Sequence, residues 1–322
     1  MVQMPFVKHC LLALLLPVTV VCLHANAAGG EAATRLEWGV YQIHWGGDRF
    51  AEGIASQTRI LGAAPQYVLF FQDLSDRRGF PTRAVEACLA IGATPVISQE
   101  LWEWRHRHSD DDTWLFRINR GDYDEKWRTW ARDAKDFEHR IIFRFGFEMN
   151  GDWFDWGQQP AAFIAAWQRV YSIVRHEIGA TNVEFMFSPN VEWDAYKPLT
   201  KIELYYPGDD YVDLLGLDGY NFGDHHSEWH RWQSYSEIFE ASLKIMSQWP
   251  QKLYLSEIGC ADGSGKSTWI EDFLNSVQKD SRISGFIYYN HFDGRKGEPN
   301  WRLDSDPETL EVFRKFATQT AE

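Results

Sequence analysis

Short strand-like runs and helix-like runs alternate along most of this 322-residue chain. Eight runs are rich in β-branched and aromatic residues, and stretches with helical hydrophobic spacing separate them. The strand-like runs are residues 37–45, 67–74, 94–99, 140–148, 183–190, 212–221, 252–259 and 283–291. The helix-like runs are residues 48–61, 82–91, 124–137, 160–178, 236–249, 267–279 and 307–316. This alternation predicts an α/β fold, a single-domain (β/α)8 or TIM barrel. A doubly wound open sheet is the alternative, because alternation alone does not establish closure.

The N-terminus has the order of a secretory signal peptide. Lys8 precedes an apolar run over residues 11–21, and residues 25–27 (Ala-Asn-Ala) have the small-x-small pattern of a cleavage site. The apolar run is short and contains Pro17, which disfavours a membrane span, although an uncleaved anchor is the alternative. We therefore predict a signal peptide at residues 1–27 and one domain at residues 28–322. The protein is expected to be exported, either periplasmic or secreted, with no membrane insertion after signal removal.

Charge and composition narrow the class of ligand. A net charge of −14 argues against nucleic acid, because phosphate binding requires a basic surface. Sixteen tryptophans could form stacking platforms for the apolar faces of sugars, although a Trp-rich core is the alternative. Cys88 and Cys260 remain after signal removal, and we expect free buried thiols rather than a disulfide framework. Carbohydrate is the favoured partner.

Polar and aromatic residues gather where the predicted strands end, which is where parallel barrels carry their chemistry. The ends read His44-Trp45, Gln72-Asp73, Gln99-Glu100, Glu148-Met149-Asn150, Ser188-Pro189-Asn190, Asp218-Gly219-Tyr220-Asn221, Ser256-Glu257 and Asn290-His291. Glycosidic bonds are cleaved by two carboxyl groups, one giving a proton and the other attacking or activating water. Glu148 and Glu257 end the fourth and seventh strands, across the barrel mouth from each other. A single rim glutamate is more often an ion-pair partner, but two among Asn, Tyr and Trp favour catalysis.

Several motifs at these ends match one family in order. They are Glu148-Met149-Asn150-Gly151-Asp152-Trp153-Phe154, Phe187-Ser188-Pro189-Asn190, Tyr206-Pro207-Gly208-Asp209-Asp210-Tyr211-Val212-Asp213, Gly216-Leu217-Asp218-Gly219-Tyr220-Asn221, Ser256-Glu257-Ile258-Gly259 and Trp301-Arg302-Leu303-Asp304-Ser305. With them the chain resembles glycoside hydrolase family 26, the group that holds many bacterial β-mannanases, over almost all of the mature sequence. The resemblance implies a retaining (β/α)8 enzyme with glutamates on strands four and seven.

The resemblance also implies roles for single residues. Glu148 would be the general acid/base and Glu257 the nucleophile. Tyr220 would donate a hydrogen bond to Glu257, although a rim tyrosine in water is the alternative. Trp153 would shape the sugar site beside Glu148. Arg144 would set carboxylate geometry, although an ordinary ion pair is the alternative.

The chain departs from the family at one important position. Family members usually carry His immediately before the acid/base, and this chain has Phe147. Phenylalanine cannot donate a hydrogen bond, so the substrate stays open between β-mannan, β-1,3-xylan, mixed-linkage β-glucan and an exopolysaccharide. Further candidates for sugar contact, besides Phe147, are Asn190, His44, His291, Trp102, Trp104, Trp156, Phe222, Trp229, Trp232 and Trp301, with loop packing as the alternative for the aromatic residues.

Two further patterns imitate other sites. Residues 259–268 look like a phosphate loop, but five residues rather than four separate Gly259 from Gly265, and we expect Ser267 or Thr268 to cap a helix. His226 and His230 have the spacing of metal ligands without the flanking metalloprotease pattern. We therefore expect no metal and no cofactor.

These observations lead to two hypotheses. The first is an endo-acting, retaining β-glycoside hydrolase, monomeric, that cleaves a polysaccharide backbone by double displacement. The second is a carbohydrate-binding protein with weak or no activity on a hydrolase scaffold, acting in exopolysaccharide assembly or export. Phe147 supports the second hypothesis, and the presence of both glutamates with Tyr220 supports the first.

Overall fold

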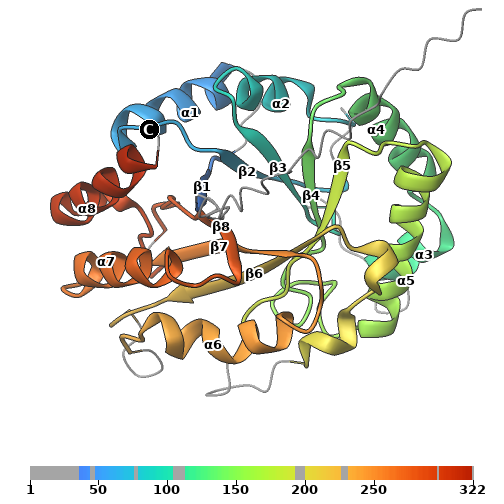
Figure 1. Cartoon of the computed structure of the whole chain (residues 1–322). Helices are drawn as coiled ribbons and strands as arrows, with labels where there is room; N and C mark the ends of the chain where they lie inside the picture. The colour runs from blue at the N-terminus through green and yellow to red at the C-terminus, as the bar shows by residue number, and fades with distance from the viewer. Residues whose placement is uncertain are drawn as a thin grey trace, which may run out of the picture. The chain divides into compact units, whose positions relative to one another are not determined.

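Eight parallel strands pair in chain order and close into a barrel, which confirms the predicted (β/α)8 fold and excludes the open sheet (Figure 1). The computed structural model describes residues 36–43, 48–75, 79–103, 113–192, 200–225, 231–295 and 297–320. The strands are β1 (Glu37–Tyr41), β2 (Tyr67–Gln72), β3 (Thr94–Gln99), β4 (Ile141–Phe145), β5 (Val183–Phe187), β6 (Leu214–Asn221), β7 (Lys252–Cys260) and β8 (Ile283–Tyr288).

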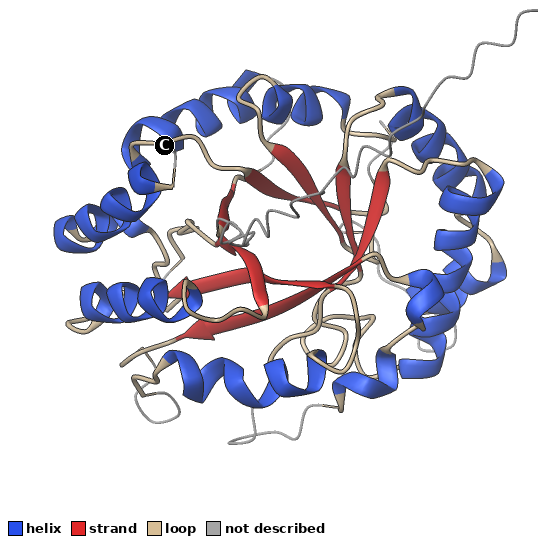
Figure 2. Cartoon of the chain, viewed as in Figure 1, coloured by secondary structure: helices blue, strands red, loops and turns tan. Residues whose placement is uncertain are grey.

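Helices follow the strands and surround the barrel (Figure 2). They are α1 (Asp48–Leu61), α2 (Thr82–Leu89), α3 (Trp114–Arg120), α4 (Asp124–Asp136), α5 (Pro160–Tyr171), α6 (Tyr235–Met246), α7 (Lys266–Val277) and α8 (Pro307–Gln319). Proline stands at the first turn of both α5 and α8, as predicted, because no N–H is needed there. Among the described residues, no helix is long and apolar enough to cross a membrane.

The structure differs from the prediction at three helices. Helix α3 was not predicted, since it has only seven residues, but Thr113 caps its start and Gly121 ends it in the left-handed conformation. The predicted helix over residues 160–178 changes to a π-helical turn at Ser172–Glu177. Helix α7 begins at Lys266 with Gly265 before it and no side-chain cap, so the predicted capping by Ser267 or Thr268 is wrong.

Strand alternation separates two apolar regions. Outward side chains such as Val68, Phe143 and Phe286 belong to the large core between strands and helices. Inward side chains such as Leu69, Ile142 and Ile287 form a smaller cluster inside the barrel. Cys88 and Cys260 are both free and buried, as predicted. The apolar interior supports a polar layer closer to the carboxyl ends of the strands.

That polar layer contains one long side chain among small ones. Arg144 of β4 is fully buried there and donates to Ser98 of β3 and to Ser188, which directly follows β5; Ser188 in turn bonds Ser256 of β7. A Cβ at Gly216 would lie 2.3 Å from the hydroxyl oxygens of both Ser188 and Ser256. Glycine is therefore required at this close approach. The small residues leave room for the Arg144 side chain to cross the barrel interior.

Candidate active site

Glu148 lies in a turn just beyond β4 rather than on the predicted strand end. Gly146 and Glu148 have φ angles of +58° and +51°, so the strand cannot continue through them. The left-handed conformation costs a residue such as Glu148 on the order of 1–3 kcal/mol, and such outliers gather at functional sites. The Glu148 backbone N–H donates to the Ser188 carbonyl at 2.8 Å, which holds the turn against β5.

Two neutral donors bind the Glu148 carboxyl group. Asn190 donates from Nδ2 to Oε1 at 2.7 Å, and Trp153 donates from Nε1 to Oε2 at 2.6 Å. Burial raises the pKa of Glu148 to about 7, and the nearby charge of Glu257 adds to this shift. Asn190, Trp153 and Arg144 oppose the rise. Near neutral pH this carboxyl group can therefore both give and take a proton.

Glu257 reaches the barrel mouth through an irregularity of β7. Gly216 of β6 pairs with Tyr254 of β7, and Asp218 pairs with Glu257. The two pairs are two residues apart on β6 but three apart on β7, so β7 holds one extra residue between them. The pairing of β7 with β8 shifts in the same region. A bulge of this kind breaks strict alternation, so Ser256 and Glu257 both turn their side chains toward polar partners inside the barrel.

The partners of Glu257 are a cation and a phenol. Arg144 donates from Nη1 to Oε2 at 3.1 Å, and the Tyr220 hydroxyl group donates to Oε1 in a short hydrogen bond. Burial, followed by the charges of Glu257 and Glu148, raises the pKa of Tyr220 well above its ordinary value. Tyr220 therefore stays protonated and remains a donor to Glu257.

Arg144 connects Glu257 to a third carboxyl group, Asp218. Burial opposes the charge of Arg144, but Asp218 and Glu257 outweigh it and raise its pKa, so it stays a cation. Its Nη2 donates to Asp218 in a short bond, its Nη1 also donates to Ser98 at 2.7 Å, and its Nε donates to Ser188 at 3.1 Å. The guanidinium is thus fixed on every side, which determines where Glu257 can sit.

Asp218 was not singled out from the sequence. It is fully buried, it accepts from Ser256 Oγ at 2.6 Å, and burial raises its pKa well above the ordinary value. Asp218 stands two residues before Tyr220 on β6, and strand alternation places residues two apart on the same face. That spacing is the signal that could have identified it.

Phe147 lies beneath the site rather than on its surface. Only 3% of its surface is exposed, and its ring packs on Phe154 and Trp156 at centroid distances of 5.1 and 5.6 Å. The Arg144 guanidinium lies 4.9 Å from the Phe147 ring centroid, a cation–π contact. Trp102 belongs to the same cluster through Trp156, at 5.2 Å. Phe147 therefore has little surface for a sugar, and it contacts the site through Arg144.

The other predicted contact residues are divided between the site and its supports. Trp153 keeps 45% of its surface exposed beside Glu148, whereas Trp301 keeps 9% and packs against Tyr220 at 4.8 Å. His291 follows β8, near Tyr41 at 5.4 Å, and burial lowers its pKa. The predicted residues outside the described part of the chain are His44, Trp104, His226, Trp229 and His230.

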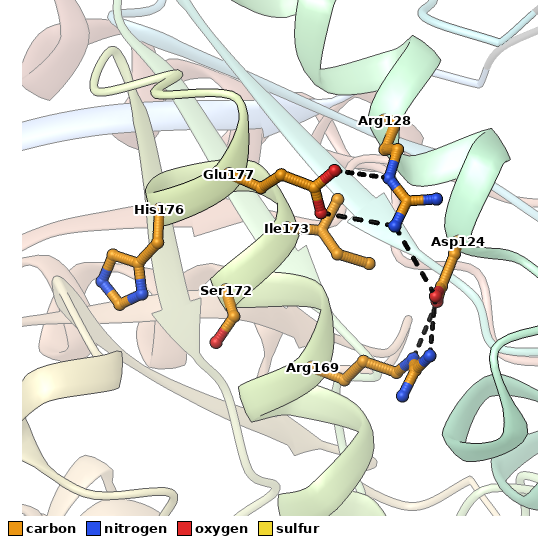
Figure 3. Close-up of a pocket in the computed structure, with 7 residues that line it drawn as sticks. All are labelled: Asp124, Arg128, Arg169, Ser172, Ile173, His176 and Glu177. Carbon is orange, nitrogen blue, oxygen red and sulfur yellow. Dashed lines mark hydrogen bonds and ion pairs between the residues drawn. The ribbon is translucent and has the colours of Figure 1, made fainter.

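A hollow of about 510 Å³ lies elsewhere, between α4 and the α5 end (Figure 3). Its arginines are already paired: Arg128 Nε with Glu177 at 2.6 Å, and Arg169 Nη2 with Asp124 at 2.6 Å. It contains none of the predicted site residues. In the described ranges, no three His, Cys, Asp or Glu side chains gather in a way that could hold a metal ion.

A parallel barrel with two buried glutamates at the ends of its fourth and seventh strands has the architecture of glycosidases that use a carboxyl pair. A sequence model described as glycosyl hydrolase family 26 matches residues 115–285, which include Glu148 and Glu257. That span exceeds half of the chain, and the chain belongs to this family.

Individual relatives agree with this assignment. Endoglucanase H of Acetivibrio thermocellus is 28% identical over 268 residues, which is 80% of this chain and 28% of that protein. Mannan endo-1,4-beta-mannosidase A and B of Caldalkalibacillus mannanilyticus is 35% identical over 94 residues, 26% of this chain and 17% of that protein. The chain thus spans less than a third of the length of either relative.

A solved structure shares the fold. The GH26 β-mannanase BoMan26A of Bacteroides ovatus matches with a TM-score of 0.66, at 20% identity over 89% of each chain.

Proposed function

We propose that this chain is a retaining, endo-acting β-glycoside hydrolase that cleaves the backbone of a polysaccharide. The observation that carries the proposal is the contrast between two neighbouring glutamates. Glu148 has neutral donors and a pKa raised to about 7, whereas Glu257 has Arg144 and the protonated Tyr220. These environments suit an acid/base and a nucleophile, respectively.

In the proposed mechanism, Glu257 attacks the anomeric carbon while protonated Glu148 gives its proton to the leaving oxygen. The product of this step is a glycosyl ester of Glu257 together with the released sugar alcohol. Glu148, now ionised, removes a proton from water, and the water oxygen displaces Glu257 from the anomeric carbon. Trp153 donates to Glu148 with its ring half exposed, and would contact the sugar beside the leaving oxygen.

The substrate class is proposed from chemistry and from the relatives. One relative is named an endoglucanase and the other a mannan endo-1,4-beta-mannosidase, and these names favour a β-glucan or a β-mannan backbone. β-1,3-Xylan and an exopolysaccharide are further candidates. The formal charge of −14 disfavours a polyanionic polymer, since like charges repel. In this proposal, residues 28–322 are the catalytic domain of an exported monomer that needs no cofactor and binds no nucleic acid.

A substrate panel tests the proposal. Purified protein would be incubated with β-mannan, β-1,3-xylan, lichenan and exopolysaccharide, and new reducing ends would be counted. We expect cleavage of at least one polymer, with products of several sugar units and retained anomeric configuration by NMR. Binding to a polymer without cleavage of any member would favour the alternative, a carbohydrate-binding protein on a hydrolase scaffold.

A further inference from the structure

The loop between β7 and α7, residues 259–266, is rich in glycine and ends in a buried lysine. Only 1% of Lys266 is exposed, and it begins α7. A buried ammonium is costly unless it is paired, and a cation at a helix N-terminus also opposes the helix dipole. Both costs favour an apolar residue here, so the partners of Lys266 need an explanation.

Those partners belong mainly to the loop between β8 and α8. Lys266 Nζ donates to the Arg302 carbonyl at 2.7 Å and to the Asn300 carbonyl at 3.3 Å. It also contacts Ser305 Oγ at 3.1 Å and Asp262 Oδ1 at 2.8 Å. The two carbonyl groups belong to the residues on either side of Trp301. One ammonium therefore binds the backbone of both sequence neighbours of this tryptophan.

Trp301 in turn supports the donor to Glu257. Its ring packs on Tyr220 with centroids 4.8 Å apart. A Cβ at Gly259 would lie 2.8 Å from the Tyr220 ring and 3.1 Å from Trp301, so glycine lets both rings approach the strand closely. The Tyr220 hydroxyl group donates to Glu257. A continuous set of contacts thus leads from Lys266 to Glu257.

The other glycines of the loop contact the opposite neighbour, Trp232 of the β6–α6 loop. A Cβ at Gly263 or Gly265 would lie 2.8 or 2.9 Å from the Trp232 ring. Trp232 is held by its own hydrogen bond to Asp224 Oδ2 at 2.7 Å. Residues 259–266 therefore join the loops on both sides, and the pattern that imitates a phosphate loop has a structural use.

We propose that Lys266 is a positioning residue for the nucleophile. By binding the carbonyl groups of Asn300 and Arg302, the neighbours of Trp301, it holds Tyr220 in its hydrogen bond with Glu257. The consequence for catalysis rests on the proposed function, whereas the consequence for the position of Tyr220 does not.

The test compares Lys266→Met with Lys315→Met. Lys315 lies on α8, is 69% exposed and has only a 3.8 Å ion pair with Glu311, so it controls for loss of a lysine. Crystal structures of both variants and of the unchanged protein would be compared. kcat and KM would be measured on whichever of lichenan or β-mannan is cleaved faster.

We expect Lys266→Met to displace Trp301 and break or lengthen the bond from Tyr220 to Glu257. kcat should fall by about ten- to a hundredfold, as for a small misplacement of a reacting group, with little change in KM. Lys315→Met should leave the position of Tyr220, kcat and KM unchanged. An unmoved Tyr220, or an unchanged kcat, would overturn the proposal.

If Lys266→Met does not fold, Ser305→Ala removes one exposed partner of the ammonium, and we expect a smaller fall in kcat with little change in KM. An unchanged kcat in that variant would contradict the proposal. If the unchanged protein cleaves no polymer, the proposed function fails, and the position of Tyr220 in the Lys266→Met or Ser305→Ala crystal structure alone decides the role of Lys266.

Discussion

Glu148 and Glu257 are the same kind of side chain in the same barrel mouth, with 7% and 6% of their surfaces exposed. Their donors differ. Neutral groups, Asn190 and Trp153, bind Glu148, whereas the cation Arg144 and the phenol Tyr220 bind Glu257. Equal burial therefore does not give the two carboxyl groups equal electrostatic surroundings.

The backbone produces this difference. Glu148 follows a strand that has already ended, in a left-handed turn that leaves it beside the β5 loop and Asn190. Glu257 remains inside β7, where the bulge directs it toward Arg144. The turn after β4 therefore places Glu148 beside one set of donors, and the bulge of β7 places Glu257 beside another.

The largest effect on activity is expected when either carboxyl group is removed. Glu257→Ala should lower kcat by about 10⁴-fold or more on every substrate, because the group that forms the covalent intermediate is gone. Glu148→Ala should lose activity mainly on substrates with poor leaving groups. With good leaving groups it should form the glycosyl enzyme and then stall, which a pre-steady-state burst would reveal.

Azide distinguishes the two variants further. A small anion can enter the space left by Glu148, and Glu148→Ala should release a β-glycosyl azide. An α-glycosyl azide from Glu257→Ala, and none from Glu148→Ala, would reverse the assignment. Near-normal activity of either variant on a true substrate would show that other residues carry the chemistry.

Removing the Arg144 cation should abolish the difference in donors between Glu148 and Glu257. Arg144→Met leaves Asp218 and Glu257 buried without their partner, so we expect about 3–5 kcal/mol less free energy of unfolding, measured by urea denaturation. Activity should fall by about a hundredfold or more, because Glu257 loses its cationic partner and its fixed position. Arg128→Met, at the exposed pair with Glu177, is the control and should cost less than about 1 kcal/mol. Equal losses in the two variants would contradict the role of Arg144.

A smaller effect is expected from Trp153→Phe. In the proposed mechanism protonated Glu148 is the acid, and burial raises its pKa to about 7, so kcat/KM should fall as pH rises through about 7. The Trp153 donor lowers that pKa, so its removal should raise the pKa and move the basic limb to higher pH. A pH series of kcat/KM measures this shift. A limb that stays in place or moves down would show that Trp153 does not tune Glu148.

The smallest effect on rate is expected from Phe147→His. The ring is buried against Arg144, so a histidine there adds a polar group beside the guanidinium without opening the site. We expect kcat on the best substrate to change by only about a few fold. The ratios of activity across the panel should change more, with a shift toward β-mannan. Unchanged ratios would show that this position carries no specificity.

Much of the candidate active site could be predicted from the order of residues in the sequence. The strand runs placed Glu148, Tyr220 and Glu257 near strand ends, and the motifs marked Trp153 and Arg144 as their neighbours. The aromatic residues were harder to predict. Trp301 and Trp102 stand in loops, where a platform and a packing residue have the same local pattern, and the structure places both rings against other rings.

Local sequence by itself determined the alternation of strands and helices, the glutamates near two strand ends and the prolines that begin α5 and α8. These features depend on residues close together in the chain, so periodicity and turn chemistry reveal them. Only the tertiary structure decided that Arg144 would meet Asp218 and Glu257. That meeting requires closure of the barrel, the β7 bulge and the space left by Gly216, which involve strands more than seventy residues apart. Lys266 is a similar case, because most of the groups that stabilise its charge come from a distant loop, and among them are the Asn300 and Arg302 carbonyls.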